Sequence, residues 1–344
     1  MSPPTLSDLP PPPPGKTGWP WTLETKRLPD AMPDGKPWPR ISIVTPNYNY
    51  GQFIEETIRS VLLQGYPDLE YIVIDGGSTD DSVEIIKKYE KWITYWESEC
   101  DRGQSNAINK GFSRATGGVY AWLNSDDIYN PGALLSAGKY FAGEKICHFL
   151  TGDGEFVHSM TEKVLMNKRA GPYSFKQLME YHKGMYLPQP SVFFSETAYK
   201  ELGGINRELS YAMDLDFWLR LRLIYPLHYL PGSLSKLRQH EGAKTLRDNE
   251  DAMGEVVGVV RRYLPELAGL DRLKLRVGSS MFLSTAICMQ GYKHYFGNDR
   301  ALALGSLKRA ITTNALFSFH PLALKLALRL FMPDWMKQKL FNAP

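Results

Sequence analysis

The chain of 344 residues is long enough for about two domains, one of them with a full α/β core. Hydrophobic residues make up 43% and charged residues 22%, which excludes a disordered or collagen-like chain. The net charge of +3 is too small to predict nucleic-acid binding, so we expect no nucleic-acid partner. Three cysteines far apart in sequence, Cys100, Cys147 and Cys288, predict no zinc site and favour a reducing, cytoplasmic compartment.

Residues 1–37 are expected to form a proline-rich N-terminal arm. The run Pro10–Pro14 excludes helix and central strand, because proline lacks a backbone donor. Trp19, Trp21 and Trp38 are unusual for a linker and predict that part of the segment packs on the domain surface; a partner-binding peptide is the alternative. The N-terminal sequence predicts no secretory signal, and no apolar stretch of the chain predicts a membrane span.

From Ile41 onward, short β-branched runs alternate with amphipathic segments of helical period. The expected strands are Ile41–Thr45, Tyr71–Ile74, Thr94–Trp96, Val119–Leu123, Phe149–His158 and Glu162–Asn167. The expected helices are Phe53–Leu63, Ser82–Tyr89, Asn106–Ala115, Pro131–Phe141, Phe175–His182, Glu196–Leu202 and Asp214–Ile224. This alternation predicts an α/β fold with a mainly parallel central sheet flanked by helices.

After about Leu246 the pattern is helical, so residues 246–344 are expected to form a helical C-terminal region. Its last 44 residues carry six Lys/Arg and one acidic residue. Leu322, Leu326 and Leu330 stack on one helical face, although the same spacing also fits a strand. Packing on the main domain and docking on an anionic membrane surface both remain open for this basic, leucine-rich region.

Polar and acidic residues follow the ends of two predicted strands. The first strand is not followed by G-x-G-x-x-G, so a dinucleotide-binding site is not indicated. The second strand ends at Asp75, at the edge where open α/β sheets bind ligands, which places Asp75 to accept hydrogen bonds from a base or ribose. A plain turn or helix cap is the alternative.

A later strand stops abruptly at Asn124-Ser-Asp-Asp127. Two adjacent carboxylates repel each other unless they are solvated or bridged by a cation. A Mg²⁺ or Mn²⁺ ion that also holds substrate phosphates would bridge them, which makes Asp126 and Asp127 candidate metal ligands. A solvated turn before the helix that starts at Pro131 is the alternative.

Several motifs occur together in an order that resembles family 2 glycosyltransferases with the GT-A fold, over about residues 41–245. They are Thr45-Pro-Asn-Tyr-Asn49, Asp75-Gly-Gly-Ser-Thr-Asp80, Glu97-x-x-x-Asp101-x-Gly103, Asn124-Ser-Asp-Asp127, Gln189-Pro-Ser, Met213-Asp-Leu-Asp-Phe-Trp and Leu237-Arg-Gln-His240. The resemblance implies an inverting, metal-assisted transfer of a sugar from a nucleotide-diphospho-sugar, with UDP favoured. The implied acceptor is a hydroxyl of a glycan or lipid-linked glycan, as in polysaccharide biosynthesis for the cell envelope. The GT-A domain is expected at residues 38–245.

The resemblance also implies roles for individual residues. Nucleotide-sugar binding falls to Thr45, Pro46, Asn47, Tyr48, Asp75, Asp101, Arg102, Asn124, Ser125 and Gln189. Mn²⁺ or Mg²⁺ would be held by Asp126, Asp127 and His240. Asp214 is the expected general base, and the alternative for it is a helix cap or a first-turn acid favoured by the helix dipole. Asp216 is the rival base, although its position two residues further along the helix should make it point elsewhere. Arg102, Arg238 and Lys244 are expected either to neutralise the departing diphosphate or to be solvated charges.

Asn124 and Met213 stand where the family often has acids. A catalytically silent nucleotide-sugar-binding or scaffolding protein of the same fold is therefore the alternative, against which the presence of Asp126 and Asp214 argues. A sugar-nucleotide pyrophosphorylase is disfavoured, because the loop after the first strand has no glycine- and basic-rich phosphate-binding sequence. The expected location is cytoplasmic, at the inner face of the membrane if the C-terminal region docks there.

Overall fold

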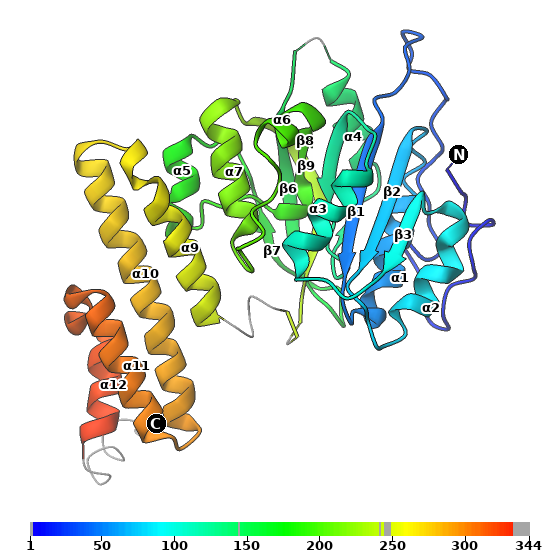
Figure 1. Ribbon diagram of the computed structural model, residues 1–344. Helices are drawn as coiled ribbons and strands as arrows, with labels where there is room; N and C mark the ends of the chain where they lie inside the picture. The colour runs from blue at the N-terminus through cyan, green and yellow to red at the C-terminus, as the bar shows by residue number, and fades with distance from the viewer. Residues whose placement is uncertain (1–2, 144, 241, 244–248, 333–344) are drawn as a thin grey trace. The chain divides into compact units, whose positions relative to one another are not determined.

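The computed structural model describes residues 3–143, 145–240, 242–243 and 249–332 (Figure 1). The chain divides into two compact units. The N-terminal unit comprises Met1–Leu178 and Tyr186–Glu241, and the C-terminal unit comprises Met179–Met185 and Gly242–Pro344.

The N-terminal unit is built on one mixed sheet of nine strands among the described residues. The strands are β1 (Ile41–Asn47), β2 (Leu69–Asp75), β3 (Tyr95–Ser98), β4 (Val119–Trp122), β5 (Ile128–Tyr129), β6 (Phe149–His158), β7 (Val164–Lys168), β8 (Val192–Ser195) and β9 (His228–Gln239). They lie in the order β3-β2-β1-β4-β8-β6-β9-β5, and β7 pairs with β6. The first four strands pair in parallel, as the alternating pattern predicts. Beyond β4 the sheet is mixed, because β8, β5 and β7 pair antiparallel.

Helices cover both faces of this sheet. They are α1 (Gly51–Leu62), α2 (Ser82–Tyr89), α3 (Gln104–Arg114), α4 (Ala133–Phe141), α6 (Glu196–Glu201) and α7 (Met213–Ile224). The short helix α5 (Phe175–Met179) lies where the chain passes from the N-terminal unit to the C-terminal unit. The expected helix Phe175–His182 is shorter, and a 3-10 turn, Tyr181–Lys183, follows it. The sequence pattern does not predict β8 and β9, because β8 has only four residues and Pro231-Gly232 interrupts the alternation in β9.

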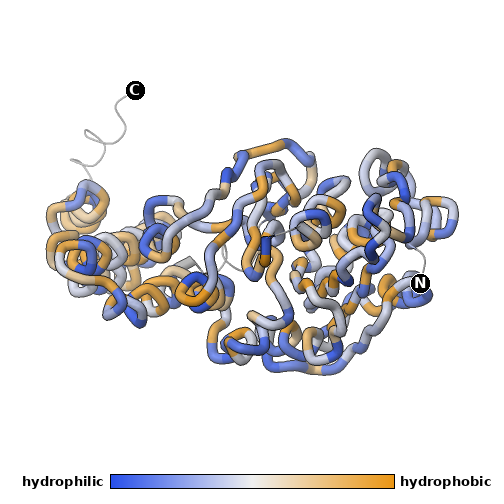
Figure 2. The backbone as a smooth tube through the Cα atoms, turned by 90° about the horizontal axis from the view of Figure 1, so that it is seen from above, coloured by the Kyte–Doolittle hydropathy of each residue, from blue (hydrophilic) through white to orange (hydrophobic). Residues whose placement is uncertain are grey.

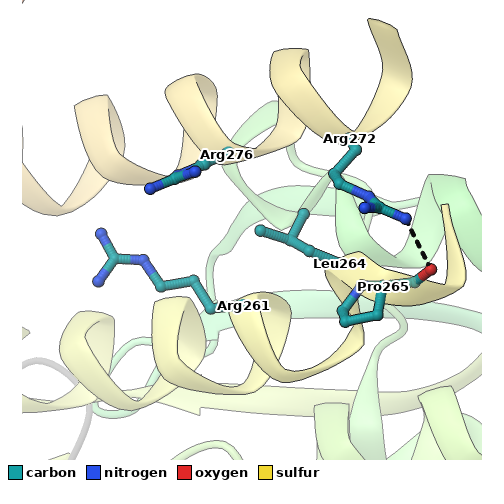
Figure 3. A pocket seen from close by; sticks show the side chains of 5 residues that line it. All are labelled: Arg261, Leu264, Pro265, Arg272 and Arg276. Carbon is teal, nitrogen blue, oxygen red and sulfur yellow. Dashed lines mark hydrogen bonds between the residues drawn. The ribbon is translucent and has the colours of Figure 1, made fainter. Parts of the chain in front are cut away.

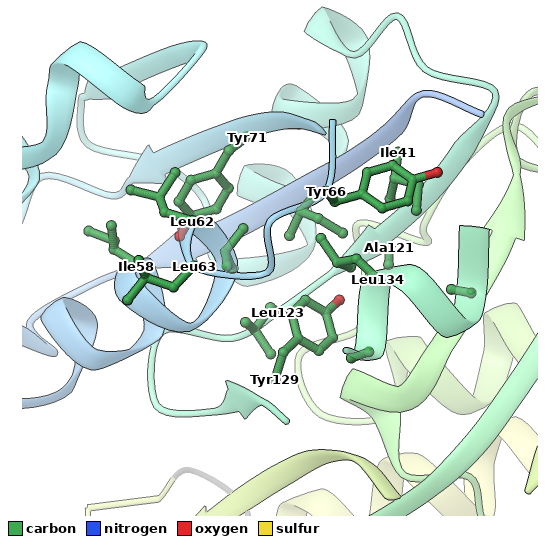
Figure 4. Close-up of a cluster of buried hydrophobic side chains, with 14 of the residues drawn as sticks. Ile41, Ile58, Leu62, Leu63, Tyr66, Tyr71, Ala121, Leu123, Tyr129 and Leu134 are labelled. Atoms are coloured by element: carbon green, nitrogen blue, oxygen red, sulfur yellow. The ribbon is translucent and has the colours of Figure 1, made fainter. Parts of the chain in front are cut away.

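The alternation of side chains along the buried parallel strands places α1 and α3 on opposite faces of the sheet. Ile43 of β1 belongs to the core that α1 closes with Ile54 and Ile58, together with side chains of β2, β4, β5 and α4 (Figure 4). The next residue, Val44, points to the other face, where α3 crosses it at Gly111. A Cβ on Gly111 would lie 2.4 Å from Cγ1 of Val44, so this close helix–strand contact requires glycine.

The N-terminal arm packs on the N-terminal unit through a buried arginine of α1. The guanidinium of Arg59 donates to the backbone oxygens of Pro10 (2.8 Å), Pro20 (3.1 Å) and Trp21 (3.1 Å). It also lies 5.3 Å from the ring centroid of Trp21, which is 3% exposed. Trp38 is buried in the main core and its indole donates to the backbone oxygen of Pro29. Surface packing of the arm, rather than a free linker, is therefore what the structure shows.

The C-terminal unit is helical. Its helices are α9 (Asn249–Tyr263), α10 (Gly269–Phe296), α11 (Arg300–Thr313) and α12 (Pro321–Phe331), with 3-10 turns at Leu264–Glu266 and Ala315–Phe319. The segment that also fits a strand is therefore a helix. Leu326 and Leu330 of α12 are buried among α10 and α11 side chains, whereas Leu324, Leu328 and Phe331 are exposed.

Hydrophobic and hydrophilic residues interleave along the chain (Figure 2). Among the described residues, no helix combines the length and the apolar character that crossing a membrane requires.

We predict that Gly111→Ala lowers the free energy of unfolding by about 1–3 kcal/mol, because the added methyl must displace the Val44 side chain. Gly258→Ala is the matched control, because it lies in α9 with open space around its Cβ position, and it should be neutral or slightly stabilising. Denaturant unfolding followed by circular dichroism measures both. Equal effects of the two variants would contradict the close contact.

Candidate active site

The loops that follow β1 and β2 are bonded to each other at the carboxyl edge of the sheet. The side-chain amide of Asn47 donates to Asp75 Oδ1 (2.6 Å) and Ser78 Oγ (3.2 Å). Asn49, whose φ of +56° is unusual for a residue other than glycine, accepts from the Thr79 amide (2.8 Å). The backbone amide of Asn49 in turn donates to Ser78 Oγ (2.8 Å). The two loops, residues 47–49 and 75–79, are therefore joined by hydrogen bonds into one surface, which we call the ledge.

Asp75 is the centre of this ledge and is fully buried. Its carboxylate accepts hydrogen bonds from Asn47 Nδ2, the Gly77 and Ser78 amides, Ser78 Oγ and Ser98 Oγ, at 2.6–3.1 Å. Thr45 is buried as well, and its Oγ1 accepts from the Tyr71 hydroxyl. The side chains of Asp75 and Thr45 thus support the ledge from within. Direct contact of these two residues with a nucleoside stays a prediction. Pro46 is also buried, whereas Tyr48 is 59% exposed.

A third loop, Asn124–Asp127 after β4, is held by Arg238 near the end of β9. The Arg238 guanidinium pairs with Glu56 of α1 (2.9 Å) and donates to Thr57 Oγ1 (3.1 Å). Its Nε donates to the backbone oxygen of Asp126. Thr57 Oγ1 also lies within 2.8 Å of the backbone oxygens of Ser125 and Asp127. Arg238 is 6% exposed, so it is a buried anchor of this loop and not a solvated charge.

Two of the three predicted metal ligands lie together. His240 Nε2 is 3.2 Å from Asp126 Oδ2, and the Asp126 side chain is 20% exposed. The imidazole is fixed by ring contacts with Phe53 (4.6 Å between centroids) and Tyr50 (5.6 Å). These contacts join the end of β9 to the start of α1.

Asp127 differs from the expectation. It is buried, and its Oδ1 accepts a hydrogen bond from the Arg238 amide (3.1 Å). Burial, followed by repulsion from Asp126, raises the pKa of Asp127 well above its ordinary value, although the amide and charge of Arg238 oppose the shift. This carboxyl group is turned into the interior and supports the loop, whereas Asp126 is the more exposed of the two. A role for Asp127 in metal binding stays a prediction.

Asp126 and His240 bring one carboxylate and one imidazole together. The 3.2 Å between His240 Nε2 and Asp126 Oδ2 is a hydrogen-bond distance, and a carboxylate oxygen and an imidazole nitrogen are both atoms that divalent transition-metal ions such as Mn²⁺ bind. No group of three or more His, Cys, Asp or Glu side chains suited to a metal occurs within the part of the chain that the structure describes.

The other predicted binding residues are placed around these loops. The Asn124 side chain accepts from Gln104 Nε2 at the start of α3 (2.7 Å). Gln189 donates to the Trp122 backbone oxygen (2.8 Å), and its buried Oε1 has no hydrogen-bond partner among the described residues. Asp101 is half-buried; burial, and then the charge of Asp75, raise its pKa. Arg102 is exposed, Ser125 is buried, and Lys244 lies outside the described residues.

The helix that carries Asp214 is packed onto β4. Trp218 of α7 stacks on Trp122 at 5.1 Å between centroids, and Asp214 lies one turn before Trp218 on a neighbouring part of the same helix face. Asp214 is half-buried in the first turn of α7. Asp216 is 1% exposed, and its carboxylate accepts a hydrogen bond from Arg220 Nε (2.9 Å).

Comparison with known proteins agrees with the resemblance seen in the sequence. Residues 42–203 match the model of glycosyl transferase family 2. An uncharacterized glycosyltransferase of Mycobacterium tuberculosis is 31% identical over 189 residues, which cover 54% of this chain and 70% of that protein. The chain belongs to glycosyl transferase family 2.

Solved structures similar to this glycosyltransferase show the GT-A fold. S. aureus TarS 1–349 in complex with UDP-GlcNAc has a TM-score of 0.55 at 17% identity, covering 85% of this chain and 88% of that one. The chain covers only 53% of the longer TarS chain. The mannosyltransferase PcManGT from Pyrobaculum calidifontis, in complex with GDP-Man and Mn²⁺, has a TM-score of 0.53 at 16% identity, covering 93% and 92%.

Sequence reasoning missed three residues that shape this site: Glu56, Thr57 and Gln104. The only signal for Glu56 and Thr57 is that polar residues occupy the buried face of α1. That signal shows an internal polar contact but not its partner, which is about 180 residues away in sequence.

We predict that Arg238→Ala lowers the free energy of unfolding by about 3–5 kcal/mol, because it leaves the Glu56 carboxylate buried without its partner. Arg40→Ala is the control, since the Arg40–Asp68 pair is half-exposed and should contribute about 1 kcal/mol or less. Urea unfolding followed by tryptophan fluorescence reports both. A loss from Arg238→Ala no larger than that from Arg40→Ala would show that the loop is held by other contacts.

Proposed function

We propose that this glycosyltransferase moves a sugar from a UDP-sugar to a hydroxyl of a glycan or lipid-linked glycan, with inversion at the anomeric carbon and with help from Mn²⁺ or Mg²⁺. The observation that carries the proposal is the pairing of Asp126 with His240 beside the ledge. Nucleotide sugars in two structural neighbours, UDP-GlcNAc in TarS and GDP-Man in PcManGT, support a nucleotide-sugar donor.

The nucleoside would lie on the ledge formed by the loops after β1 and β2. Tyr48 is the exposed aromatic side chain there and offers a face for stacking on the base. Asn124 and Gln189 present side-chain amides near the end of β4, where they would bond to ribose and sugar hydroxyls. Arg102 is exposed and carries no carboxylate partner among the described residues, so its charge is free to meet a diphosphate.

Asp126 and His240 would hold the divalent cation, which would offset the negative charge that develops on the leaving nucleoside diphosphate. Asp127 and Arg238 support this pair indirectly. They fix the loop backbone, so that Asp126 keeps its position against the imidazole of His240.

Asp214 would take the proton of the acceptor hydroxyl as that oxygen attacks the anomeric carbon. Direct displacement with inversion needs a base on the side opposite the leaving diphosphate. Asp214 lies in the first turn of α7, where the helix dipole interacts favourably with a carboxylate.

The donor can be identified by thermal shift with UDP, GDP, CDP and dTDP, each with Mn²⁺, Mg²⁺ or a chelator. We expect UDP with Mn²⁺ to raise Tm, because a ligand that binds only the folded state stabilises it. Asp126→Asn should abolish the metal-dependent part of this shift, whereas Asp251→Asn, an exposed carboxylate of α9, should leave it unchanged. The absence of any shift from a folded protein would contradict the proposed donor site.

Asp214→Asn should lower kcat by about 10²–10⁴-fold while Tm and UDP affinity stay near the wild-type values. Asp216→Asn should instead lower the free energy of unfolding by about 1–3 kcal/mol, because it weakens the buried bond to Arg220. Release of UDP and product analysis measure transfer. Full transfer by Asp214→Asn would exclude this residue as the base. A wild-type protein that binds UDP-sugar without any transfer would instead support the alternative, a silent nucleotide-sugar-binding protein.

We also propose that the protein is cytoplasmic and docks on the inner face of the membrane through α12. Leu324, Leu328 and Phe331 are 49%, 46% and 70% exposed on this helix, beside basic residues that favour anionic lipid. Leu328→Glu should reduce co-sedimentation with phosphatidylglycerol vesicles about tenfold, since one buried leucine contributes about 1.5–3 kcal/mol. Leu23→Glu, at an exposed leucine of the N-terminal arm, should have no effect. Equal vesicle binding by both variants and the wild type would contradict docking through α12.

A further inference from the structure

A pocket of about 440 Å³ lies in the C-terminal unit where α9 ends and α10 begins (Figure 3). It is lined by Arg261, Leu264, Pro265, Arg272 and Arg276. Three of these five residues are arginines, and they come from two different helices. None of them is among the residues assigned to sugar transfer.

One wall of the pocket is fixed by Arg272. Its guanidinium donates to the backbone oxygens of Leu267 (2.8 Å) and Pro265 (2.9 Å), which closes the turn between the helices. Leu264, only 8% exposed, anchors the same turn from inside. The Arg272 side chain is therefore held in place by the backbone of the turn.

The other two arginines keep most of their hydrogen-bonding capacity. Arg261 donates to the neutral Ser280 hydroxyl (3.0 Å), and the Arg276 guanidinium has no partner within the described part of the chain. No salt bridge to Arg261, Arg272 or Arg276 occurs among the described residues. Figure 3 shows the guanidinium groups of Arg261 and Arg276 at the same end of the pocket, one from each helix.

The acidic residues in this part of the sequence do not balance the charge of its basic residues. Residues 261–276 contain five Lys/Arg and two acidic residues. Cations held close together raise each other's energy, and an anion that binds between them removes that cost. An arrangement of this kind favours a negatively charged ligand over an empty pocket.

We propose that this pocket binds a phosphoryl group, carried either by an anionic phospholipid headgroup or by a soluble phosphoester. One planar guanidinium fork can satisfy the two coplanar oxygens of a carboxylate. Guanidinium groups that come from two helices approach a ligand from different directions, which suits the tetrahedral oxygens of a phosphate better than the planar oxygens of a carboxylate. The volume exceeds that of a phosphate ion and leaves room for its ester substituent.

An exposed apolar face of α10 beside the pocket fits a lipid as one source of the phosphoryl group. Leu270, Leu273 and Val277 are 70%, 56% and 38% exposed, and their spacing places them on one face of α10. An apolar face next to arginines is what a lipid headgroup and its upper acyl chains would contact. This inference is independent of the transfer reaction.

The test uses the full chain and two variants of α10 that remove the same charge. Arg276→Ala removes a pocket arginine, whereas Lys274→Ala removes an exposed lysine on another side of the helix. Inorganic phosphate is titrated at constant ionic strength while the arginine Nε–H signals are followed by NMR. We expect saturable shifts for the wild type and for Lys274→Ala, and an affinity at least about tenfold weaker for Arg276→Ala. Arg276→Lys, which keeps the charge, should also bind more weakly.

Absence of saturable shifts, or equal weakening by Arg276→Ala and Lys274→Ala, would overturn the proposal, since binding would then be non-specific attraction. Phosphatidylglycerol vesicles and phosphatidylcholine vesicles distinguish the two sources when Arg276→Ala is made in the Leu328→Glu background, where α12 no longer contributes to vesicle binding. Loss of phosphatidylglycerol binding when Arg276→Ala, but not Lys274→Ala, is added supports a lipid headgroup. Unchanged vesicle binding together with weaker phosphate binding supports a soluble phosphoester.

Discussion

The buried pair of Arg238 and Glu56 is the interaction on which the rest of the active site depends. It joins the end of β9 to α1, and the same guanidinium reaches the Asn124–Asp127 loop. A buried ion pair is retained only when hydrogen bonds compensate for lost hydration, and here Thr57 and backbone oxygens provide them. Because His240 lies two residues after Arg238, the anchor also sets the distance between the imidazole and Asp126.

Much of the parallel half of the fold follows from the sequence, because its signals are local. β1, β2 and β4 are buried on both faces and therefore read as apolar runs, and each ends in polar residues at one edge of the sheet. The antiparallel half is harder to predict. β8 is four residues long, and β9 contains a proline, a glycine and shifts in register, so neither shows a regular period.

The sequence indicates which residues lie near the end of a strand, but it does not indicate where their side chains point. Asp126 and Asp127 are adjacent in sequence, and nothing in that pair says which carboxylate is turned inward; the choice is made by the Arg238 amide, which lies 111 positions away. Likewise, Asp75 stands at the strand end where a ligand-binding acid is expected, but Ser78 and Ser98 occupy its oxygens. Contacts between residues far apart in the chain decide where these carboxylates point and what they bond to. Such contacts cannot be read from a single sequence.

The ledge after β1 and β2 has a consequence for the course of binding. Its polar groups are already bonded to one another through Asn47, Asn49 and Asp75, so a nucleotide would meet a surface that needs little ordering. A preformed surface avoids the entropic cost that flexible loops incur on association. The rate of nucleotide association would then be limited by diffusion and orientation. The heat-capacity change of binding would come from the apolar area of the ligand that is buried, with no contribution from loop folding.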